Sequence, residues 1–268
     1  MELQGRLDQL TREGLGLVAV SYDPVPILAD FAARRGITFP LLSDEGSAVI
    51  RAYGILNTGV PTTNATYGIP HPGTFILNAK GEVTSRFFES AYQERNTMTS
   101  VLVKLGSKID VRATKMSAPH LTVTTYLTDR VAAPGTRFAV VLDVVPGSRV
   151  HVYAPGVTGY IPIALAVEGQ PGLLTRATQF PKPDDYFFKP LNEHVPVYQR
   201  PFRIVEDLAI DPSPPAVAAL KDRTEMSLRG ALTYQACDDQ VCFTPQSLPI
   251  TWTIGLRALD RDRANPGK

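Results

Sequence analysis

The chain has few cysteines and no long apolar run. Two of its 268 residues are cysteine, Cys237 and Cys242, and residues 1–236 contain none. This size and cysteine count exclude a small protein scaffolded by disulfides. No apolar run approaches the roughly 20 residues that a membrane helix needs. The first residues lack the apolar core of a secretory signal, so none is expected in this chain.

The sequence also lacks an excess of charge of either sign. Lys and Arg number 27 and Asp and Glu 26, which gives a formal net charge of +1. Such a balance offers little attraction to a phosphate backbone, so no nucleic-acid partner is expected. Hydrophobic residues make up 44% of the chain and charged residues 20%. This composition excludes a disordered chain, and the length predicts two domains.

Residues 1–105 alternate helix and strand signals, which predicts an α/β domain. The continuous apolar run 15–22 is typical of a strand buried on both faces of a sheet. Gly36 ends the helix that follows, and Ser43 or Asp44 caps the next one. The predicted elements are, in order, a helix at 3–10, a strand at 15–22, a helix ending at 36, a strand at 39–42, a helix at 49–53, a hairpin at 73–88 and a helix at 96–105.

Residues 106–116 are predicted to be a linker. After them, apolar residues recur at every second position, as in a β-strand with one buried face. Short runs separated by Pro and Gly turns predict an antiparallel β-sandwich over residues 117–258, with a polar tail at 259–268. The predicted strands are 121–126, 137–145, 150–153, 161–167, 202–210, 226–236 and 250–256.

Three segments of the first domain, residues 19–23, 37–44 and 71–77, resemble the AhpC/TSA redoxin family of peroxiredoxin-like proteins. The resemblance implies a thioredoxin-like fold that is incomplete at the N-terminus. The family's first strand and reactive-cysteine turn would lie before Met1, so a longer parent protein is expected. The loss of that strand would leave residues 15–22 with an unpaired edge.

The family's reactive cysteine lies at a helix N-terminus, where the helix dipole and free amides lower the pKa of the thiol. Because residues 1–236 contain no cysteine, no peroxidase activity is expected from this chain. Pro72 occupies the position where thioredoxin-like proteins keep a cis-proline. His71 and Arg95 would be polar neighbours of the missing thiol, or else ordinary surface residues.

Cys237 and Cys242 are separated by four residues, which fits a short hairpin loop that places them opposite each other. A disulfide there would close so short a loop that it stabilises the fold by only about 2 kcal/mol. At a loop tip it would be exposed and reducible, which suits a redox shuttle. Asp238 and Asp239 disfavour an adjacent thiolate, so the pair is not a pre-activated nucleophile. A structural disulfide, two free thiols and a metal site are the alternatives.

The segment Tyr-Gln-Ala-Cys-x4-Cys-Phe-Thr-Pro at 234–245 resembles the N-terminal domain of DsbD, the thiol–disulfide interchange protein. Residues 150–155 and 180–183 extend the resemblance. It implies an immunoglobulin-like sandwich, a redox role for both cysteines, thioredoxin-like partners and an extracytoplasmic compartment, such as the periplasm, for the intact parent.

The same resemblance implies a cap loop with an aromatic side chain over the cysteines. The corresponding segment is 184–191, so Phe187 or Phe188 is the cap candidate, with a place in the core as the alternative for both. Tyr153 and Tyr234 are candidates to line the site. His120, His151 and His194 have no carboxylate or cysteine partner nearby in sequence, so structural roles are expected for them. Trp252 is expected in the core.

The sequence therefore predicts a thiol–disulfide oxidoreductase that shuttles electrons through a Cys237–Cys242 disulfide. Thioredoxin-like proteins are the expected partners, including the redoxin domain of an intact parent, tethered at high effective concentration. No cofactor and no metal are predicted. The alternatives are a binding or adaptor module with a structural disulfide, and a fragment of a peroxiredoxin-type antioxidant enzyme.

Overall fold

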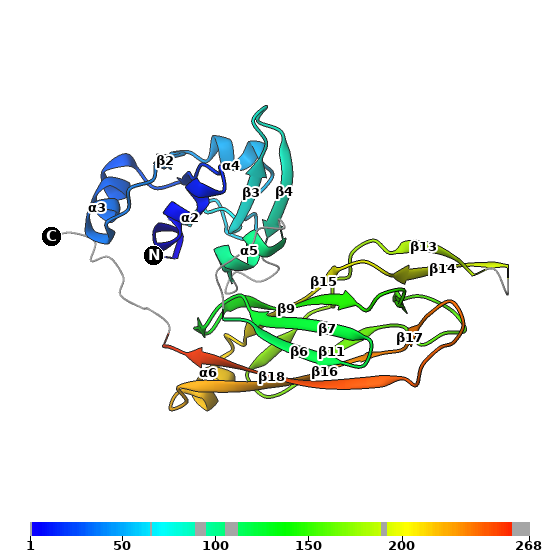
Figure 1. Cartoon of the computed structure of the whole chain (residues 1–268). Coiled ribbons are helices and arrows are strands. Elements are labelled where there is room, and N and C mark those ends of the chain that lie inside the picture. Colours follow the sequence, from blue (N-terminus) through cyan, green and yellow to red (C-terminus); the bar gives the residue numbers. More distant parts are fainter. Residues whose placement is uncertain (1, 65, 89–94, 105–111, 189–191, 259–268) are drawn as a thin grey trace. The chain divides into compact units, whose positions relative to one another are not determined.

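The computed structural model describes residues 2–64, 66–88, 95–104, 112–188 and 192–258. The chain divides at residue 107 into two compact units (Figure 1). The first unit mixes helices and short strands, and the second consists almost entirely of strands. The predicted combination of an α/β region and a β-rich region is confirmed.

The first unit follows the predicted alternation of helix and strand. Its elements are α1 (Glu2–Gly5), α2 (Leu7–Arg12), β1 (Ala19–Ser21), α3 (Val25–Arg35), β2 (Leu41–Ser43), α4 (Ala48–Ala52), β3 (Gly73–Leu77), β4 (Val83–Phe88), β5 (Arg95–Asn96) and α5 (Met98–Lys104). This order is consistent with a thioredoxin-like domain.

The predicted helix boundaries have visible local causes. Helix α3 ends at Gly36, whose φ of 60° is in the left-handed region that glycine adopts without strain. The Asp44 carboxylate accepts bonds from the amides of Val49 (3.0 Å) and Ile50 (2.8 Å), so Asp44 supplies the capping bonds of α4 although Ser47 holds the N-cap position. Burial opposes ionisation of Asp44, but these amides outweigh it and hold the pKa of the carboxyl below its usual value.

The strand predicted at residues 15–22 is shorter and more exposed than expected. Strand β1 pairs in parallel with β2, and β3 pairs with β4 in a separate antiparallel hairpin. Among the described residues no strand joins these two sheets. Val20 in β1 is 43% exposed and Leu42 in β2 is 50% exposed. The prediction of burial on both faces was wrong, because the paired residues Val20 and Leu42 stay exposed on one face of the two-stranded sheet.

The second unit contains thirteen strands and one helix among its described residues. They are β6 (Thr114–Ala118), β7 (Leu121–Leu127), β8 (Val131–Ala132), β9 (Thr136–Pro146), β10 (His151–Tyr153), β11 (Ala164–Val167), β12 (Leu173–Thr175), β13 (Asp184–Phe188), β14 (Glu193–Tyr198), β15 (Phe202–Ile210), α6 (Pro214–Leu220), β16 (Glu225–Tyr234), β17 (Ala236–Cys237) and β18 (Gln246–Leu256). Strand β6 begins inside the predicted linker 106–116, so the end of that segment is strand instead.

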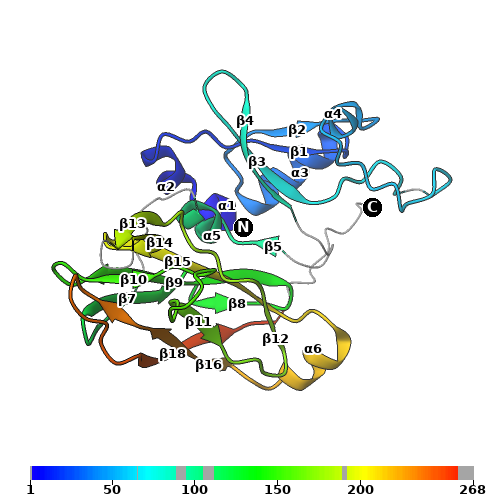
Figure 2. The same cartoon turned by 90° about the vertical axis from the view of Figure 1, so that its right-hand side faces the viewer.

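Two sheets of this unit face each other across one core. One has the order β12-β15-β9-β7-β6 and the other β11-β16-β18-β8 (Figure 2). Strand β16 alternates buried and exposed residues along its length, as a strand with one face in a core does. The core between the sheets includes Val123, Phe138, Leu142, Ile204, Leu208, Leu228, Leu232 and Ile254. The unit is therefore a β-sandwich; an immunoglobulin-like topology stays a prediction.

Trp252 is a buried residue of β18, as predicted. Its side chain is 6% exposed, and its indole N–H donates to the Thr125 hydroxyl at 2.9 Å. Thr125 lies on β7 of the opposite sheet. This bond therefore links the two layers of the sandwich and satisfies a polar group in the core.

A third sheet, ordered β13-β14-β10-β17, carries Cys237 on its edge strand. Strands β13 and β14 pair from Asp184 opposite Val197 to Phe188 opposite Glu193. The prediction of a cap loop at 184–191 was therefore wrong for 184–188, which alternate in burial as a strand does. Residues 189–191 lie outside the described residues.

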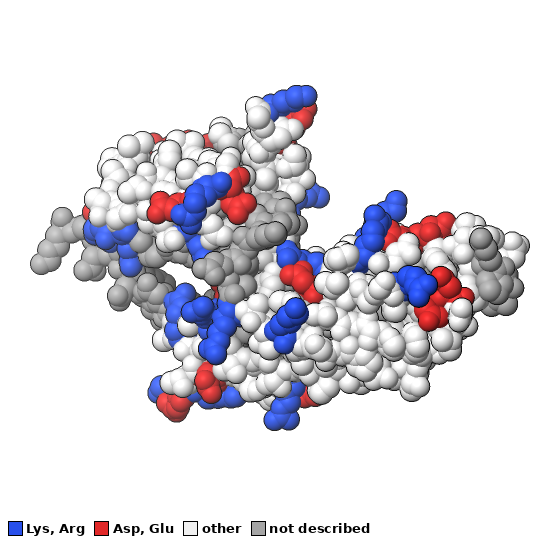
Figure 3. Space-filling model, viewed as in Figure 1, with Lys and Arg blue, Asp and Glu red and all other residues white. Residues whose placement is uncertain are grey.

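Charge is scattered over the visible face of both units. Figure 3 shows basic and acidic side chains interspersed among broad uncharged areas. Among the described helices, none has the length and apolar character to cross a membrane.

Candidate functional site

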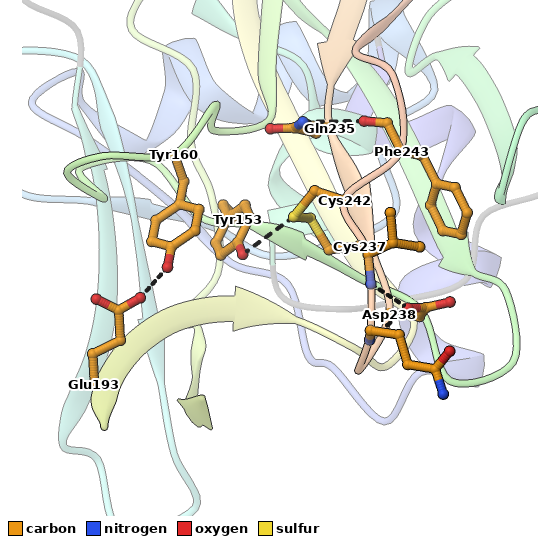
Figure 4. Close-up of a disulfide and its surroundings, with 10 residues drawn as sticks. Tyr153, Tyr160, Glu193, Gln235, Cys237, Asp238, Cys242 and Phe243 are labelled. Atoms are coloured by element: carbon orange, nitrogen blue, oxygen red, sulfur yellow. Dashed lines mark hydrogen bonds between the residues drawn. A yellow bond between two sulfur atoms is a disulfide. The ribbon is translucent and has the colours of Figure 1, made fainter. Parts of the chain in front are cut away.

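A disulfide joins Cys237, at the end of β17, to Cys242 (Figure 4). The two residues face each other as an isolated antiparallel bridge, with a Cα–Cα separation of 4.0 Å. The amide of Phe243 donates to the Ala236 carbonyl at 2.8 Å and continues this pairing past the disulfide. The tight loop predicted from the four-residue spacing therefore forms.

Asp238 holds the loop between the cysteines. Its carboxylate accepts bonds from the amides of Gln240 and Val241, both at 2.8 Å, and its own amide donates to the Val241 carbonyl at 3.0 Å. The two amide donors hold the pKa of Asp238 below its usual value. The carboxylate thus has a structural partner inside the loop, which fixes the position of Cys242.

The two cysteines differ sharply in exposure. Cys237 is 1% exposed and packs against Tyr153, Val195 and Val197 of the third sheet. Cys242 is exposed. The expectation of an exposed disulfide therefore holds for one sulfur only. The solvent-accessible residue of the pair is therefore Cys242, and the third sheet encloses Cys237.

Tyr153 of β10 lies beside the exposed cysteine, its phenol oxygen 3.7 Å from the Cys242 sulfur. Its ring stacks on Tyr160 at a centroid distance of 4.2 Å, and the Tyr160 hydroxyl donates to the Glu193 carboxylate (Figure 4). Burial, together with Tyr160, Glu193 and Tyr186, raises the pKa of Tyr153 to about 12. The phenol therefore stays protonated and can donate to sulfur.

His151 lies directly opposite Cys237 in the register of β10 and β17. The imidazole is buried and its ring centroid lies 4.6 Å from that of Tyr186. Burial lowers the pKa of His151, while Asp239 and Asp238 oppose the shift. The prediction gave His151 a structural role because no cysteine or carboxylate lies near it in sequence, whereas strand pairing places it opposite Cys237, 86 positions away.

Three residues near the disulfide carried no sequence signal: Tyr160, Tyr186 and Glu193. The Tyr186 hydroxyl donates to Asp239 at 2.9 Å, which ties β13 to the cysteine loop. These residues reach the site through strand pairing and through the loop after β10. A local motif could not reveal them.

Other predicted site residues lie elsewhere. Phe187 is 42% exposed, and its ring centroid lies 4.9 Å from that of His194. Phe188 is half-buried at the end of β13. The cap role of either stays a prediction. Tyr234 is fully buried in the sandwich core, where its hydroxyl donates to the Pro119 carbonyl, so it does not line the disulfide.

The two remaining histidines have specific neighbours. His194 lies 2.8 Å from the Asp185 carboxylate. These residues are nine apart in sequence, and the β13–β14 hairpin brings them together. His120 stacks on Phe243 at a centroid distance of 3.8 Å, which packs the segment following Cys242.

Two of the three positions predicted as remnants of a redoxin site, His71 and Pro72, have described side chains. His71 is exposed, and its amide donates to the Ile55 carbonyl at 2.7 Å. The described residues contain no cis peptide bond, so the cis-proline expected at Pro72 is instead the intrinsically favoured trans form. The side chain of Arg95 lies outside the described residues. No group of three or more His, Cys, Asp or Glu in the described segments could hold a metal ion.

Residues 1–86 match the sequence model of the AhpC/TSA family. Alkyl hydroperoxide reductase E of Mycobacterium tuberculosis (strain ATCC 25618 / H37Rv) is 36% identical over 95 residues, covering 32% of this chain and 56% of that protein. Peroxiredoxin Bcp of Xanthomonas campestris pv. campestris is 29% identical over 83 residues, covering 31% of this chain and 51% of that protein. The first unit is thus similar to AhpC/TSA proteins over residues 1–86, and the chain spans about half the length of these relatives.

Solved structures give weaker likenesses. The N-terminal periplasmic domain of ScsB from Proteus mirabilis aligns with a TM-score of 0.34 and 17% identity, covering 51% of this chain and 49% of that one. The GAE domain of GGA2p from Saccharomyces cerevisiae aligns with a TM-score of 0.31 and 9% identity, covering 53% and 97%. Both scores are too low to assign a fold.

Proposed function

We propose that this chain is a thiol–disulfide exchange protein that passes electrons through Cys237 and Cys242 to or from thioredoxin-like partners. The observation that carries the proposal is the asymmetry of the disulfide: Cys242 is exposed and Cys237 is 1% exposed. The redoxin family of the first unit supports a redox role in general.

The exchange begins when a partner thiolate attacks the exposed Cys242 sulfur. The Cys237–Cys242 bond breaks, its electron pair leaves on the Cys237 sulfur, and a new disulfide joins Cys242 to the partner. A second thiolate of the partner then attacks the partner's own sulfur in this mixed disulfide and releases Cys242. The partner ends as a disulfide, and the pair has gained two electrons. The reverse sequence carries electrons the other way.

Tyr153 assists the second step. Its phenol is protonated and lies 3.7 Å from the Cys242 sulfur, so it can donate to the departing thiolate. A redoxin domain with a reactive thiol in an intact parent is a natural partner, as are separate thioredoxin-like proteins. An oxidising extracytoplasmic compartment suits such a disulfide.

The test is a redox titration of the full chain. The protein is equilibrated in a series of thiol redox buffers, trapped with an alkylating agent and weighed. We expect a midpoint close to those of thioredoxin-like partners, and loss of the transition in Cys237→Ser. A pair that stays oxidised in every buffer short of unfolding would refute the shuttle.

The two cysteine variants then test the direction of attack. Cys237→Ser leaves the exposed Cys242 free, and we expect its thiolate to form a mixed disulfide with a single-cysteine thioredoxin whose sulfur carries a thionitrobenzoate group, which departs as the leaving thiolate. Cys242→Ser leaves only the buried Cys237, and its yield should be at least about tenfold lower because thiol exchange depends on access. Equal yields would contradict attack at Cys242.

The full burial of Cys237 also favours a second candidate, an adaptor module whose disulfide only holds the loop. A structural disulfide has a potential below about −300 mV and resists thioredoxin. The redox titration therefore separates the two functions.

A further inference from the structure

His151 occupies an unusual position for a side chain that the exchange steps above do not use. It lies opposite Cys237 in the antiparallel pairing of β10 and β17, so both side chains project from the same face. The Cβ atoms of directly opposed residues lie about 4.5–5.5 Å apart. The imidazole is thus the cross-strand neighbour of the buried sulfur.

The His151 imidazole is also unsatisfied. It is 3% exposed, and its Nε2 atom has no hydrogen-bond partner among the described residues. Buried polar atoms are nearly always paired, since an unpaired one destabilises the fold. An unpaired nitrogen beside a disulfide therefore suggests a partner that exists in another redox state.

Two phenol rings pack against His151, and charged groups of both signs lie near it. The rings of Tyr153 on its own strand and Tyr186 on β13 pack against it, and both phenols have a raised pKa because they are buried. Asp238 and Asp239 from the cysteine loop act on it by charge, and Arg149 partly offsets Asp238. These carboxylates favour a protonated imidazole, while burial opposes it.

Reduction changes this balance because it creates a thiolate at Cys237. In the oxidised protein the sulfur carries no charge, and burial keeps His151 neutral. After the Cys237–Cys242 bond breaks, a negative sulfur lies opposite the imidazole in a site with little water, where opposite charges attract strongly.

We propose that His151 takes up a proton when the disulfide is reduced and forms an imidazolium–thiolate pair with Cys237. The inference rests on the proposed exchange function. A partner dithiol supplies two electrons and two protons: the electrons reduce the two sulfurs, one proton goes to His151, and the other goes to the Cys242 thiol. The partner leaves as a disulfide.

The first test uses the unmodified full chain and a small dithiol, so it does not depend on any protein partner. The pH titration of the His151 ring is followed by NMR in the oxidised and the dithiothreitol-reduced protein. We expect a higher pKa for His151 in the reduced protein. The same pKa in both states would overturn the proposal, whether or not thioredoxin-like proteins exchange with the disulfide.

The second test removes the imidazole. In a Cys242→Ser background, only Cys237 titrates as a thiol, and its ionisation is followed by thiolate absorbance. His151→Asn should raise the pKa of Cys237 by about 1–3 units, the shift that one adjacent opposite charge produces. His151→Gln serves the same purpose if the Asn variant does not fold.

The matched control is His194→Asn, which removes an exposed imidazole from the same sheet. It should leave the titration of Cys237 unchanged. A role for His151 in packing alone would lower the unfolding temperature of the oxidised protein without moving this titration. That result would overturn the proposal and leave the exchange function standing.

Discussion

The phenol oxygen of Tyr153 lies 3.7 Å from the sulfur of Cys242. Burial raises the pKa of Tyr153 to about 12, so the phenol is protonated at neutral pH. A hydrogen-bond donor therefore faces the exposed sulfur of the disulfide. The buried sulfur faces His151 from the neighbouring strand. Each cysteine thus has its own polar neighbour, and both neighbours come from the three-residue strand β10.

Tyr153→Phe should raise the pKa of the Cys242 thiol in the reduced protein by about one unit. A hydrogen bond to a charged group is worth roughly 1.5–3 kcal/mol, and about 1.4 kcal/mol corresponds to one unit. The measurement is the pH dependence of alkylation in a Cys237→Ser background.

Tyr186→Phe is the control for this prediction, since the Tyr186 hydroxyl donates to Asp239 and not to a sulfur. It should change the alkylation profile much less. Equal shifts in the two variants would contradict a specific role for Tyr153.

Glu206→Gln should stabilise the protein at neutral pH. Glu206 is 4% exposed on β15, and burial raises the pKa of its carboxyl, although the Thr178 hydroxyl (2.9 Å) partly opposes this. Because the folded pKa lies above the unfolded value of about 4.3, the ionised carboxylate disfavours the folded state as pH rises through this range. Glutamine keeps an acceptor for Thr178 without the charge.

The measurement for Glu206→Gln is the urea midpoint across pH. The variant should be more stable than the native protein at pH 7, and the two should converge below about pH 4. Glu225→Gln, at an exposed carboxylate on β16, should show no such pattern. Lower stability of the Glu206 variant at pH 7 would contradict the prediction.

Gly230→Ala should destabilise the second unit by about 1–3 kcal/mol, the usual cost of overpacking. An added Cβ would lie 2.6 Å from the Ala166 carbonyl oxygen on the paired strand and 3.1 Å from the Trp252 ring. The unfolding transition can be followed by the fluorescence of Trp252, the only tryptophan of the chain.

Gly169→Ala is the matched control, since a Cβ there meets nothing within 4 Å. Its free energy of unfolding should change by less than about 0.5 kcal/mol. Similar losses of stability in the two glycine variants would mean that the close approach of β11 and β16 does not limit the packing.

Regular strands of the second unit were well predicted from the sequence. Strand β15 has the predicted limits 202–210, and β7 and β9 differ by one residue at an end or at both. Alternation of apolar and polar residues predicts such strands from the local sequence, because every second side chain must enter the core. The short strands β13 and β14 were missed; β13 pairs with β14, and β14 joins the sheet by pairing with β10, more than 40 residues earlier in the chain.

The local sequence also determined the pairing of Cys237 and Cys242, because a four-residue spacing between two strands leaves the cysteines face to face. It could not show that one sulfur is buried and the other open. That difference depends on Val195 and Val197 of β14, which cover Cys237 from a distant part of the chain.

Of the neighbours of the disulfide, Tyr153 was a candidate from the sequence and His151 was not, and the contacts of both depend on tertiary structure. His151 meets Cys237 and Tyr153 meets Cys242 because β10 pairs with β17 and precedes the loop that carries Tyr160. Backbone register across strands sets these contacts, and register depends on which side chains the whole sandwich can bury. The sequence by itself thus determined where the redox pair lies, and the fold decided which charges and donors surround it.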